Sequence, residues 1–247
     1  MQPVEEPALT PELIRDRYDR LLARLRAAAA GVDHDPARIR VVAVTKGFGI
    51  VVVRAALEAG LTSLGENRVQ EATDKVSAAP DADWHMIGHL QANKVRAALR
   101  LFRTIHSVDS IELLDRIDRI AHDEGRRPRL LLQVNIGDEP ERSGFDLAWF
   151  DGQVDDPRGQ LVDALASIQA VEVRGLMGMA RYGSGDVARQ FARLRGLRDR
   201  LRVASGMQLP ELSMGMSADA EEAVREGATL VRIGTAIFGP RPDHHGG

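Results

Sequence analysis

The chain repeats one pattern along most of its length, in which a short apolar run is followed by an amphipathic stretch of helical periodicity. The apolar runs are typical of strands and recur at intervals of roughly 20 residues. They cover residues 39–45, 61–65, 84–88, 104–108, 130–135, 171–177, 209–213 and 229–233. Helical patterns occupy residues 51–59, 67–76, 93–101, 111–123, 187–203 and 218–226. Strands that alternate with helices predict repeated βα units in a parallel sheet.

Two architectures accommodate such repeated units. Eight βα units within 247 residues match a (β/α)8 TIM barrel, and the alternative is a doubly wound open sheet. A G-x-G-x-x-G fingerprint after the first strand would support the open sheet. Residues 46–50, KGFGI, lack the third glycine. The sequence therefore predicts an α/β fold of the barrel type.

An additional helix is predicted over residues 10–30, ahead of the first strand. Thr10 is placed as its N-cap and Pro11 at its first helical position, and leucine and isoleucine recur on one face. We expect one domain over residues 1–247, with the barrel core over residues 39–240. Residues 150–159 have the composition of a loop, and residues 241–247 that of a tail.

Composition excludes several classes of function. The chain has no cysteine, which removes disulfides, thiol catalysis and Cys-ligated zinc. Lys and Arg total 33 against 36 Asp and Glu, so no basic excess indicates a nucleic-acid partner. The N-terminus lacks a secretory signal and no apolar run is long enough to span a membrane. His85 and His89 have no HExxH frame, so no metal site is expected. We expect a cytoplasmic protein without nucleic-acid or membrane partners.

In a barrel, active groups lie at the C-terminal ends of the strands and in the loops that follow them. Lys46 follows the first strand, where partial burial would lower the pKa of its ammonium group. A lower pKa provides the free amine that Schiff-base formation requires. The alternative is a lysine that reaches solvent at the rim or pairs with a carboxylate. Lys75 and Lys94 are the only other lysines, so few residues can supply a primary amine.

Two loops at the same predicted mouth carry small residues, hydroxyls and backbone N–H groups. Residues 213–217, SMGMS, lead into a predicted helix, and Gly234 and Thr235 follow the last strand. Barrels often bind phosphate between their seventh and eighth strands. A lysine opposite a phosphate cradle is what a pyridoxal phosphate enzyme or carrier requires.

Arg232 lies within the last strand, and the alternation of that strand places it on the face opposite Ile233. A guanidinium inside a barrel needs an acceptor, which could be a carboxylate of the protein or the ring nitrogen of a cofactor. Arginine only donates hydrogen bonds, so a ring nitrogen bound to it is unprotonated. Such a ring is a weaker electron sink, which suits simple proton transfer or no catalysis.

Several segments together resemble one family. They are VVAVTK (41–46), LGENRVQE (64–71), WHMIGHLQANK (84–94), HSVDS (106–110), QVNIGDEPERSG (133–144), RGLMGMA (174–180) and LSMGMSADAEEAVREGATLVRIGTAIFG (212–239). In this order they resemble the pyridoxal phosphate homeostasis proteins, which are single-domain relatives of the alanine racemase barrel.

The resemblance implies that Lys46 holds pyridoxal 5'-phosphate (PLP) as a Schiff base. It further implies that Arg232 faces the pyridine nitrogen and that Asn67 lies near the ring. The residues that it places around the phosphate are Ser213, Met216, Ser217, Gly234 and Thr235. It also implies a protein that carries and buffers the cofactor in intracellular PLP homeostasis without evident turnover, with PLP-dependent apo-enzymes as possible acceptors.

The chain departs from the family at three places. Residues 47–50 read GFGI where relatives are rich in Lys and Pro, Arg142 replaces a common lysine, and residues 181–185 form a loop unlike that of relatives. These departures affect the rim of the site and any lysine-based release of the cofactor, but not the assignment of Lys46.

Two other functions remain open at this stage. An amino-acid racemase on the same barrel would need a second proton carrier, and the only tyrosines are Tyr18 and Tyr182. The C-terminal β-domain that carries this tyrosine in alanine racemases has no counterpart here, which also favours a monomer over a dimer. A regulator that binds partners through the Arg-rich residues 187–203 is the third hypothesis.

Overall fold

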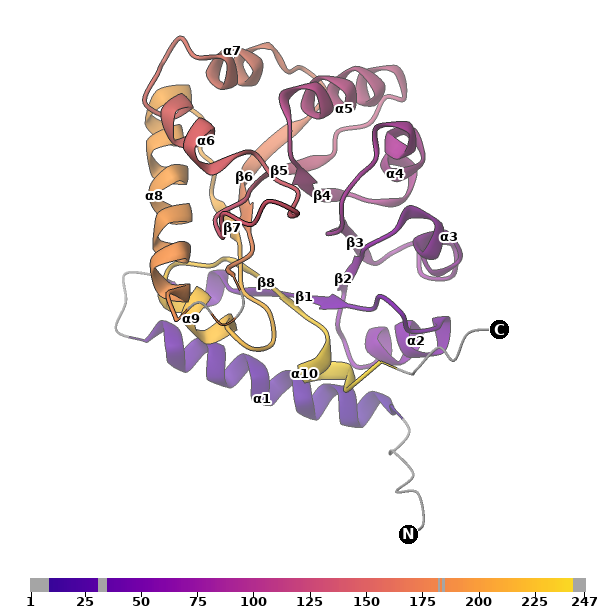
Figure 1. The fold of residues 1–247 in the computed structure, drawn as a ribbon. Coiled ribbons are helices and arrows are strands. Elements are labelled where there is room, and N and C mark those ends of the chain that lie inside the picture. The colour runs from indigo at the N-terminus through magenta and orange to yellow at the C-terminus, as the bar shows by residue number, and fades with distance from the viewer. Residues whose placement is uncertain (1–8, 31–34, 182, 184, 242–247) are drawn as a thin grey trace.

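The computed structural model describes residues 9–30, 35–181, 183 and 185–241, and its centre is a closed barrel of eight parallel strands (Figure 1). The strands are β1 (Arg40–Val44), β2 (Ser63–Glu66), β3 (Asp83–Met86), β4 (Thr104–Val108), β5 (Arg129–Val134), β6 (Glu172–Gly178), β7 (Glu211–Ser213) and β8 (Leu230–Ile233). Each strand pairs with the next in the sequence, and β8 closes on β1 with Val42 opposite Arg232. The predicted TIM barrel is confirmed.

Helices surround the barrel on its outer face (Figure 1). The α-helices are α1 (Pro11–Ala29), α2 (Ile50–Glu58), α3 (Val69–Ala78), α4 (Val95–Leu101), α5 (Ile111–Asp123), α6 (Leu147–Gln153), α7 (Gln160–Ser167), α8 (Val187–Ser205), α9 (Ala220–Arg225) and α10 (Thr235–Phe238). Two short 3-10 helices, η1 (Pro36–Arg38) and η2 (Ala92–Lys94), precede β1 and α4. The main apolar core lies between these helices and the sheet.

The additional N-terminal helix is α1, and it packs against α2, α9 and α10. Its first turn is capped as predicted, because Thr10 Oγ1 accepts a hydrogen bond from Leu13 N at 3.3 Å and Pro11 stands at the first helical position. Ile14 and Leu25 on its inner face are fully buried. The helix therefore covers one side of the barrel instead of extending into solvent.

The connection between β5 and β6 differs from its predicted form. Residues 150–159 were expected to form a loop, but the first four of them belong to α6 and α7 begins directly after the last. Asp146 caps α6 by accepting a hydrogen bond from Trp149 N at 2.7 Å, and Phe150 is fully buried. Packing of this apolar residue stabilises a helix that is too short to be predicted from its own sequence.

The interior of the barrel is only partly apolar. A small cluster separate from the main core contains Val42, Leu131, Met177 and Leu230, which come from four different strands. The other buried residues that point inward include polar side chains, such as His106 on β4 and Ser213 on β7, which contact each other. Because β4 and β7 are not neighbours in the sheet, this contact crosses the inside of the barrel.

Gly175 allows β6 to lie close to β7. Its φ angle is +156°, and a Cβ atom there would stand 1.8 Å from the carbonyl oxygen of Glu211. The pairing of β5 with β6 also shifts register next to this residue, between Leu130 and Leu131. A side chain at position 175 would therefore push two paired strands apart.

We expect Gly175→Ala to lower the free energy of unfolding by about 2 kcal/mol or more, because it adds a backbone clash to backbone strain. The control is Gly196→Ala in α8, where a Cβ would meet no atom within 4 Å. That change is expected to stabilise the protein by roughly 0.5–1 kcal/mol because alanine favours the helix. Urea denaturation of both variants measures the two changes, and equal effects would contradict the prediction.

No helix in the described part of the chain is both long enough and apolar enough to cross a membrane. The described residues also contain no cluster of three or more histidine, cysteine, aspartate or glutamate side chains arranged to hold a metal ion.

Candidate functional site

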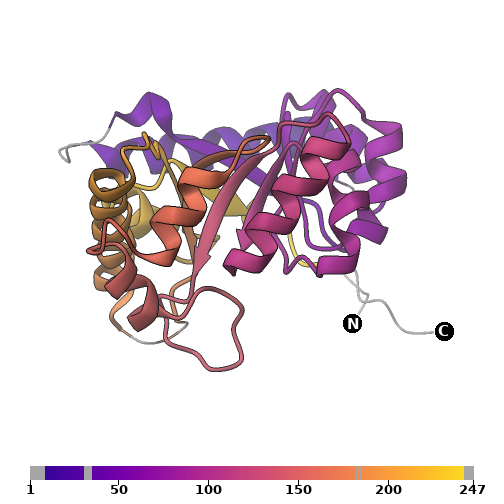
Figure 2. The same cartoon turned by 90° about the horizontal axis from the view of Figure 1, so that it is seen from above.

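A cavity of about 710 Å³ opens at the C-terminal ends of the strands. The segment between β5 and α6 projects beyond this end of the barrel and contributes Glu139, Glu141 and Arg142 to the rim (Figure 2). Seven of the eight residues predicted from the sequence line this one cavity, namely Lys46, Asn67, Met216, Ser217, Arg232, Gly234 and Thr235. The structure thus brings together loops that are far apart in the sequence.

Lys46 follows β1 in a tight turn. Phe48 N donates a hydrogen bond to Thr45 O at 3.1 Å, and Gly47 between them has a φ angle of +77°. Glycine adopts this left-handed conformation without strain, which explains why the unusual GFGI segment turns sharply beside the lysine. The side chain of Lys46 is half-buried and lines the cavity.

The environment of Lys46 favours its neutral amine. Burial has the largest effect, and the positive charges of Arg241 and Arg232 act in the same direction, so that the pKa of Lys46 lies below its usual range. The carboxylates of Glu66 and Glu71 oppose this shift. A lysine with a lowered pKa provides more of the free amine that attacks a carbonyl group.

A buried ion pair lies behind the Lys46 turn. Lys75 Nζ is 2.7 Å from Glu66 Oε1 and donates a second hydrogen bond to Thr45 O at 2.9 Å. The hydroxyl of Thr45 also donates to Glu66 Oε1, at 2.5 Å. Glu66 is fully buried, and its Oε2 atom has no hydrogen-bond partner. Since Thr45 O belongs to the peptide that precedes Lys46, the pair holds the backbone from which Lys46 extends.

Arg232 reaches the cavity from the barrel interior. Its Nη1 atom donates to Ser213 Oγ at 2.7 Å, and its Nη2 atom donates to Gly178 O at 3.1 Å. Both acceptors are neutral, so neither of them compensates the positive charge of the guanidinium that lines the cavity. Burial lowers the pKa of Arg232 to about 10, which still leaves the side chain protonated at neutral pH.

Ser213 lies beneath the cavity and does not line it. The resemblance placed it beside a phosphate, but its side chain is fully buried and its Oγ atom contacts Arg232 and His106. The strand alternation points position 213 into the barrel, whereas the following residues Met216 and Ser217 reach the cavity.

The loops after β7 and β8 are tied to each other at the rim. Ala236 N, in the first turn of α10, donates to Ser217 Oγ at 3.3 Å. Met216 N donates to Asp219 Oδ1 at 2.6 Å, which fixes the loop ahead of α9. The opening N–H groups of a helix have no carbonyl partner within that helix. Ser217, Gly234 and Thr235 lie together on one side of the cavity.

Arg142 stabilises the segment that covers the rim. Its Nη1 atom lies 2.7 Å from Glu139 Oε1 and donates to the carbonyl oxygens of Met179 and Ala180 at 3.1 and 3.2 Å. The arginine therefore ties the β5–α6 segment to the end of β6.

Sequence reasoning did not find the groups that support the site from below. Lys75 had no assigned role, His85 was considered only together with His89 as a weak metal ligand, and His106 had no role of its own. His85 Nδ1 and His106 Nε2 are 2.8 Å apart, and both side chains are buried. Nothing in the spacing of these residues along the chain indicates that they meet, because their contact depends on the register in which β3 pairs with β4. Tyr182, one of the two tyrosines considered as the second proton carrier of a racemase, lies outside the described residues.

Burial lowers the pKa of His106 well below its usual range, and the neighbouring His85, Arg232, Arg40 and Arg129 add to this effect. The unfolded chain takes up a proton at about pH 6.5, whereas the folded protein resists it. The stability contributed by His106 is therefore fully present above this pH and is lost as the pH falls.

We expect this residue alone to change the free energy of unfolding by up to about 1.4 kcal/mol per pH unit below pH 6.5. Guanidinium denaturation of the protein and of His106→Gln between pH 5 and pH 7.5 measures the difference in slope. His122→Gln, which removes an exposed histidine at the end of α5, serves as the control and should keep the original slope. Parallel pH profiles for the protein and His106→Gln would contradict the prediction.

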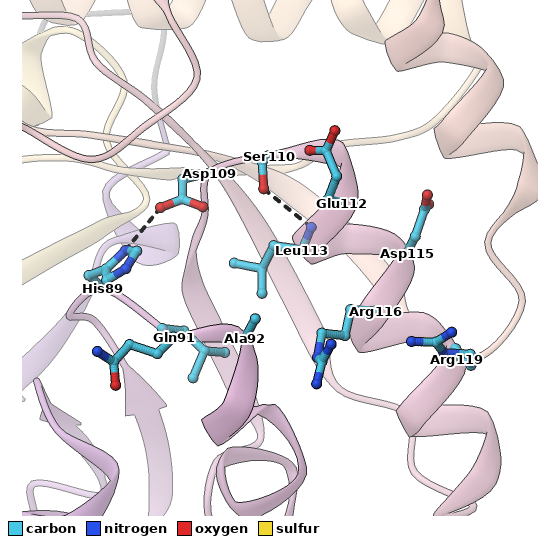
Figure 3. Close-up of a pocket in the computed structure, with 11 residues that line it drawn as sticks. His89, Gln91, Ala92, Asp109, Ser110, Glu112, Leu113, Asp115, Arg116 and Arg119 are labelled. Carbon is cyan, nitrogen blue, oxygen red and sulfur yellow. Dashed lines mark hydrogen bonds and ion pairs between the residues drawn. The ribbon is translucent and has the colours of Figure 1, made fainter.

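A second hollow lies beside the mouth, between the end of β3 and α5 (Figure 3). His89 Nδ1 pairs with Asp109 Oδ2 at 3.0 Å, and Ser110 Oγ accepts from Leu113 N as the helix cap. The charged side chains of α5 spread apart, and Glu112 points away from His89 (Figure 3). Without convergent polar groups this hollow is not a candidate active site.

The described geometry defines a class of protein: a (β/α)8 barrel with one half-buried lysine at its mouth, an arginine beside it and a rim of polar N–H and hydroxyl groups. The profile of the family described as alanine racemase, N-terminal domain, matches residues 17–242. Among proteins named pyridoxal phosphate homeostasis protein, that of Synechocystis sp. is 37% identical over 211 residues, which is 83% of this chain and 93% of the relative. That of Deinococcus radiodurans is 40% identical over 220 residues, covering 88% and 97%. The chain belongs to the alanine racemase N-terminal domain family and, within it, to the pyridoxal phosphate homeostasis proteins.

Solved structures agree with this placement. PipY of Synechococcus elongatus, in a structure with PLP bound, is 38% identical, has a TM-score of 0.78 and aligns with 92% of this chain and all of its own. An alanine racemase of Clostridium difficile has a TM-score of 0.70 at 16% identity, covering 93% of this chain and 58% of that protein. This second likeness shows the shared barrel fold alone.

Proposed function

We propose that this protein binds PLP at the mouth of the barrel through Lys46 and takes part in intracellular PLP homeostasis as a carrier and buffer. The observation that carries the proposal is that Lys46 and Arg232 line the same cavity as three residues of the loops after β7 and β8. These residues are Ser217, Gly234 and Thr235. The relatives are named for PLP homeostasis, and one related structure contains PLP.

The donor set fits the chemical parts of PLP. The cofactor supplies an aldehyde, which condenses with a primary amine to a Schiff base and releases water, together with a phosphate and a pyridine ring. Lys46 is the amine on the cavity wall, and its lowered pKa favours the reactive neutral form. Hydroxyl and backbone N–H groups of Ser217, Gly234 and Thr235 suit a phosphate.

Arg232 suits the pyridine nitrogen. A guanidinium has five N–H donors, of which two are used in bonds to Ser213 and Gly178. The remaining donors can serve a ligand in the cavity. Because the guanidinium is charged and has no acceptor, the ring nitrogen that meets it stays unprotonated, which limits carbanion chemistry and suits a carrier better than a racemase. Asn67 and Met216 line the same cavity and are proposed to contact the ring and the phosphate side, respectively.

The proposal also includes features that the sequence alone supports. We propose that the protein acts in the cytoplasm as a monomer and that it hands the cofactor to PLP-dependent apo-enzymes. Gel filtration with light scattering measures the oligomeric state. Transfer is measured by mixing the loaded protein with an apo-enzyme behind a dialysis membrane and without one, and faster activation on direct contact supports a carrier.

The visible absorption spectrum of the purified protein tests the proposal before and after treatment with borohydride. A visible band that borohydride removes, with the reduced adduct mapped to Lys46 by mass spectrometry, would support it. A colourless protein that cannot be reconstituted with PLP would overturn it. Racemisation of amino acids by the loaded protein at a steady rate would favour an enzyme instead.

A further inference from the structure

A chain of hydrogen bonds crosses the inside of the barrel from Arg232 to Asp83. His106 Nδ1 lies 2.8 Å from Ser213 Oγ, and His106 Nε2 lies 2.8 Å from His85 Nδ1. His85 Nε2 lies 3.2 Å from Asp83 Oδ2. With the bond from Arg232 to Ser213, four contacts connect the cavity to the opposite end of the barrel, where β3 begins.

The two ends of this chain fix the direction of its hydrogens. Arg232 has only donors. Asp83 is an ionised acceptor: burial raises its pKa, but its interactions with His85 and with Arg129 outweigh this effect and lower it overall. Arg129 Nη2 contacts both carboxylate oxygens, at 2.7 and 2.9 Å.

Counting hydrogens leaves one arrangement for neutral histidines. Arg232 donates to Ser213, the hydroxyl of Ser213 donates to His106 Nδ1, and His106 Nε2–H donates to His85 Nδ1. His85 Nε2–H then donates to Asp83, so each of the four bonds contains one hydrogen. In the reverse arrangement, His106 Nδ1–H would donate to Ser213 and His85 Nδ1–H would donate to His106. A neutral His85 would then have no hydrogen on Nε2, so its lone pair would face the carboxylate of Asp83 unless His85 carried an additional proton.

We propose that Asp83, His85, His106 and Ser213 form a one-directional hydrogen-bond chain that positions Arg232 for its ligand, with both histidines neutral and protonated on Nε2. They are positioning residues because none of them lines the cavity. The effect on PLP rests on the proposed function, whereas the hydrogen arrangement does not.

The chain gives Arg232 a fixed orientation that Ser213 alone would not provide. A serine hydroxyl rotates freely, so it can accept from Arg232 in several directions unless its own hydrogen has a fixed acceptor. His106 provides that acceptor, and His85 holds the tautomer of His106. A buried network whose members are all satisfied is rigid, whereas removal of one member leaves its neighbours unpaired.

The first experiment uses the protein without cofactor. Long-range proton–nitrogen NMR spectra of histidine-labelled protein report which ring nitrogen carries the hydrogen, and His85→Asn and His106→Asn assign the two signals. We expect both rings to be Nε2–H at pH 7.5. A His106 protonated on Nδ1, or a doubly protonated His85, would overturn the proposed direction. Because no PLP is present, this result does not depend on the proposed function.

The second experiment measures PLP binding by titration of the visible band. Ser213→Ala and His106→Leu are each expected to weaken the apparent affinity about tenfold or more, because hydrogen bonds to charged groups are lost or misdirected. His106→Asn, whose amide oxygen can accept from Ser213, should recover part of this loss. Circular dichroism tests whether each variant is folded. If His106→Leu fails to fold, Asp83→Asn is used instead, because it alters the hydrogen-bond chain at the end opposite Arg232.

His122→Gln, which removes an exposed histidine outside the chain of hydrogen bonds, should bind PLP as the original protein does. Unchanged affinity in folded Ser213→Ala and His106→Leu would overturn the positioning role. Failure of the original protein to bind PLP would refute the proposed function and leave the NMR result standing.

Discussion

Replacement of Lys75 by methionine is expected to lower the free energy of unfolding by about 3–5 kcal/mol, because it removes the partner of a fully buried carboxylate. Glu66 has no exposed surface, and its Oε1 atom receives hydrogen bonds from Lys75 and Thr45. Lys75 itself is 7% exposed. Methionine fills a similar volume, so the expected loss comes from the stranded charge rather than from a cavity.

The effect of Lys75→Met should grow with pH. Burial raises the pKa of Glu66 despite the opposing hydrogen bonds from Lys75 and Thr45, and loss of Lys75 removes the main group that lowers it. A carboxyl group whose pKa is higher in the folded state contributes stability at low pH that is lost as the pH rises. Urea denaturation should therefore show a larger deficit at pH 8 than at pH 5.

Two controls separate this explanation from a general loss of packing. Glu66→Gln in the Lys75→Met background removes the stranded charge and should recover about 2 kcal/mol or more. Arg225→Ala breaks an exposed pair with Glu222 and should cost less than about 1 kcal/mol. A deficit in Lys75→Met below about 1 kcal/mol at pH 8 would show that Glu66 is not held as a buried ion.

The βα repeat was predictable because each strand of the barrel corresponds to a short, largely apolar run in the sequence. The runs at 39–45 and 104–108 consist mostly of apolar or β-branched residues, and β1 and β4 lie within them. The first helix was predictable from Thr10 and Pro11, whose capping roles depend only on nearby residues. Local signals of this kind do not require knowledge of the tertiary fold.

The mouth of the barrel was predictable for a different reason. In parallel strands the C-terminal ends meet at one edge, so Lys46 and Thr235 were expected together although 189 positions separate them. The same rule cannot say how deep a side chain lies. The resemblance grouped Ser213 with the residues around the phosphate, whereas in the structure its side chain is buried and only the later residues of the loop line the cavity.

The support of the site could not be predicted from the sequence. Glu66 and Lys75 form an ion pair because α3 packs over β2, and nothing local distinguishes Lys75 from a solvated lysine at the end of a helix. His106 meets Ser213 across the barrel at a separation of 107 residues. Contacts of this kind depend on closure of the sheet, which the pattern of apolar residues indicates but does not specify atom by atom.

Replacement of Lys46 by alanine is expected to abolish the visible band and the borohydride adduct while leaving the fold intact. The pKa of Lys46 is lowered by burial and by Arg241 and Arg232, so the folded state disfavours its charge. Removal of this ammonium group relieves the cost of burying it, and Lys46→Ala should be at least as stable as the original protein at pH 7. Lys46→Arg tests the same point, because arginine keeps the charge but cannot supply a primary amine.

The matched control is Lys94→Ala, which removes the lysine at the end of η2 outside the cavity described above. It should keep both the band and the adduct. Because the chain contains only Lys46, Lys75 and Lys94, peptide mapping of the reduced protein leaves no ambiguity about the attachment point. An adduct that persists in folded Lys46→Ala would refute the assignment of Lys46. An adduct on the buried Lys75 would require its ion pair with Glu66 to open. The free energy of unfolding of Lys75→Met measures the strength of that ion pair independently.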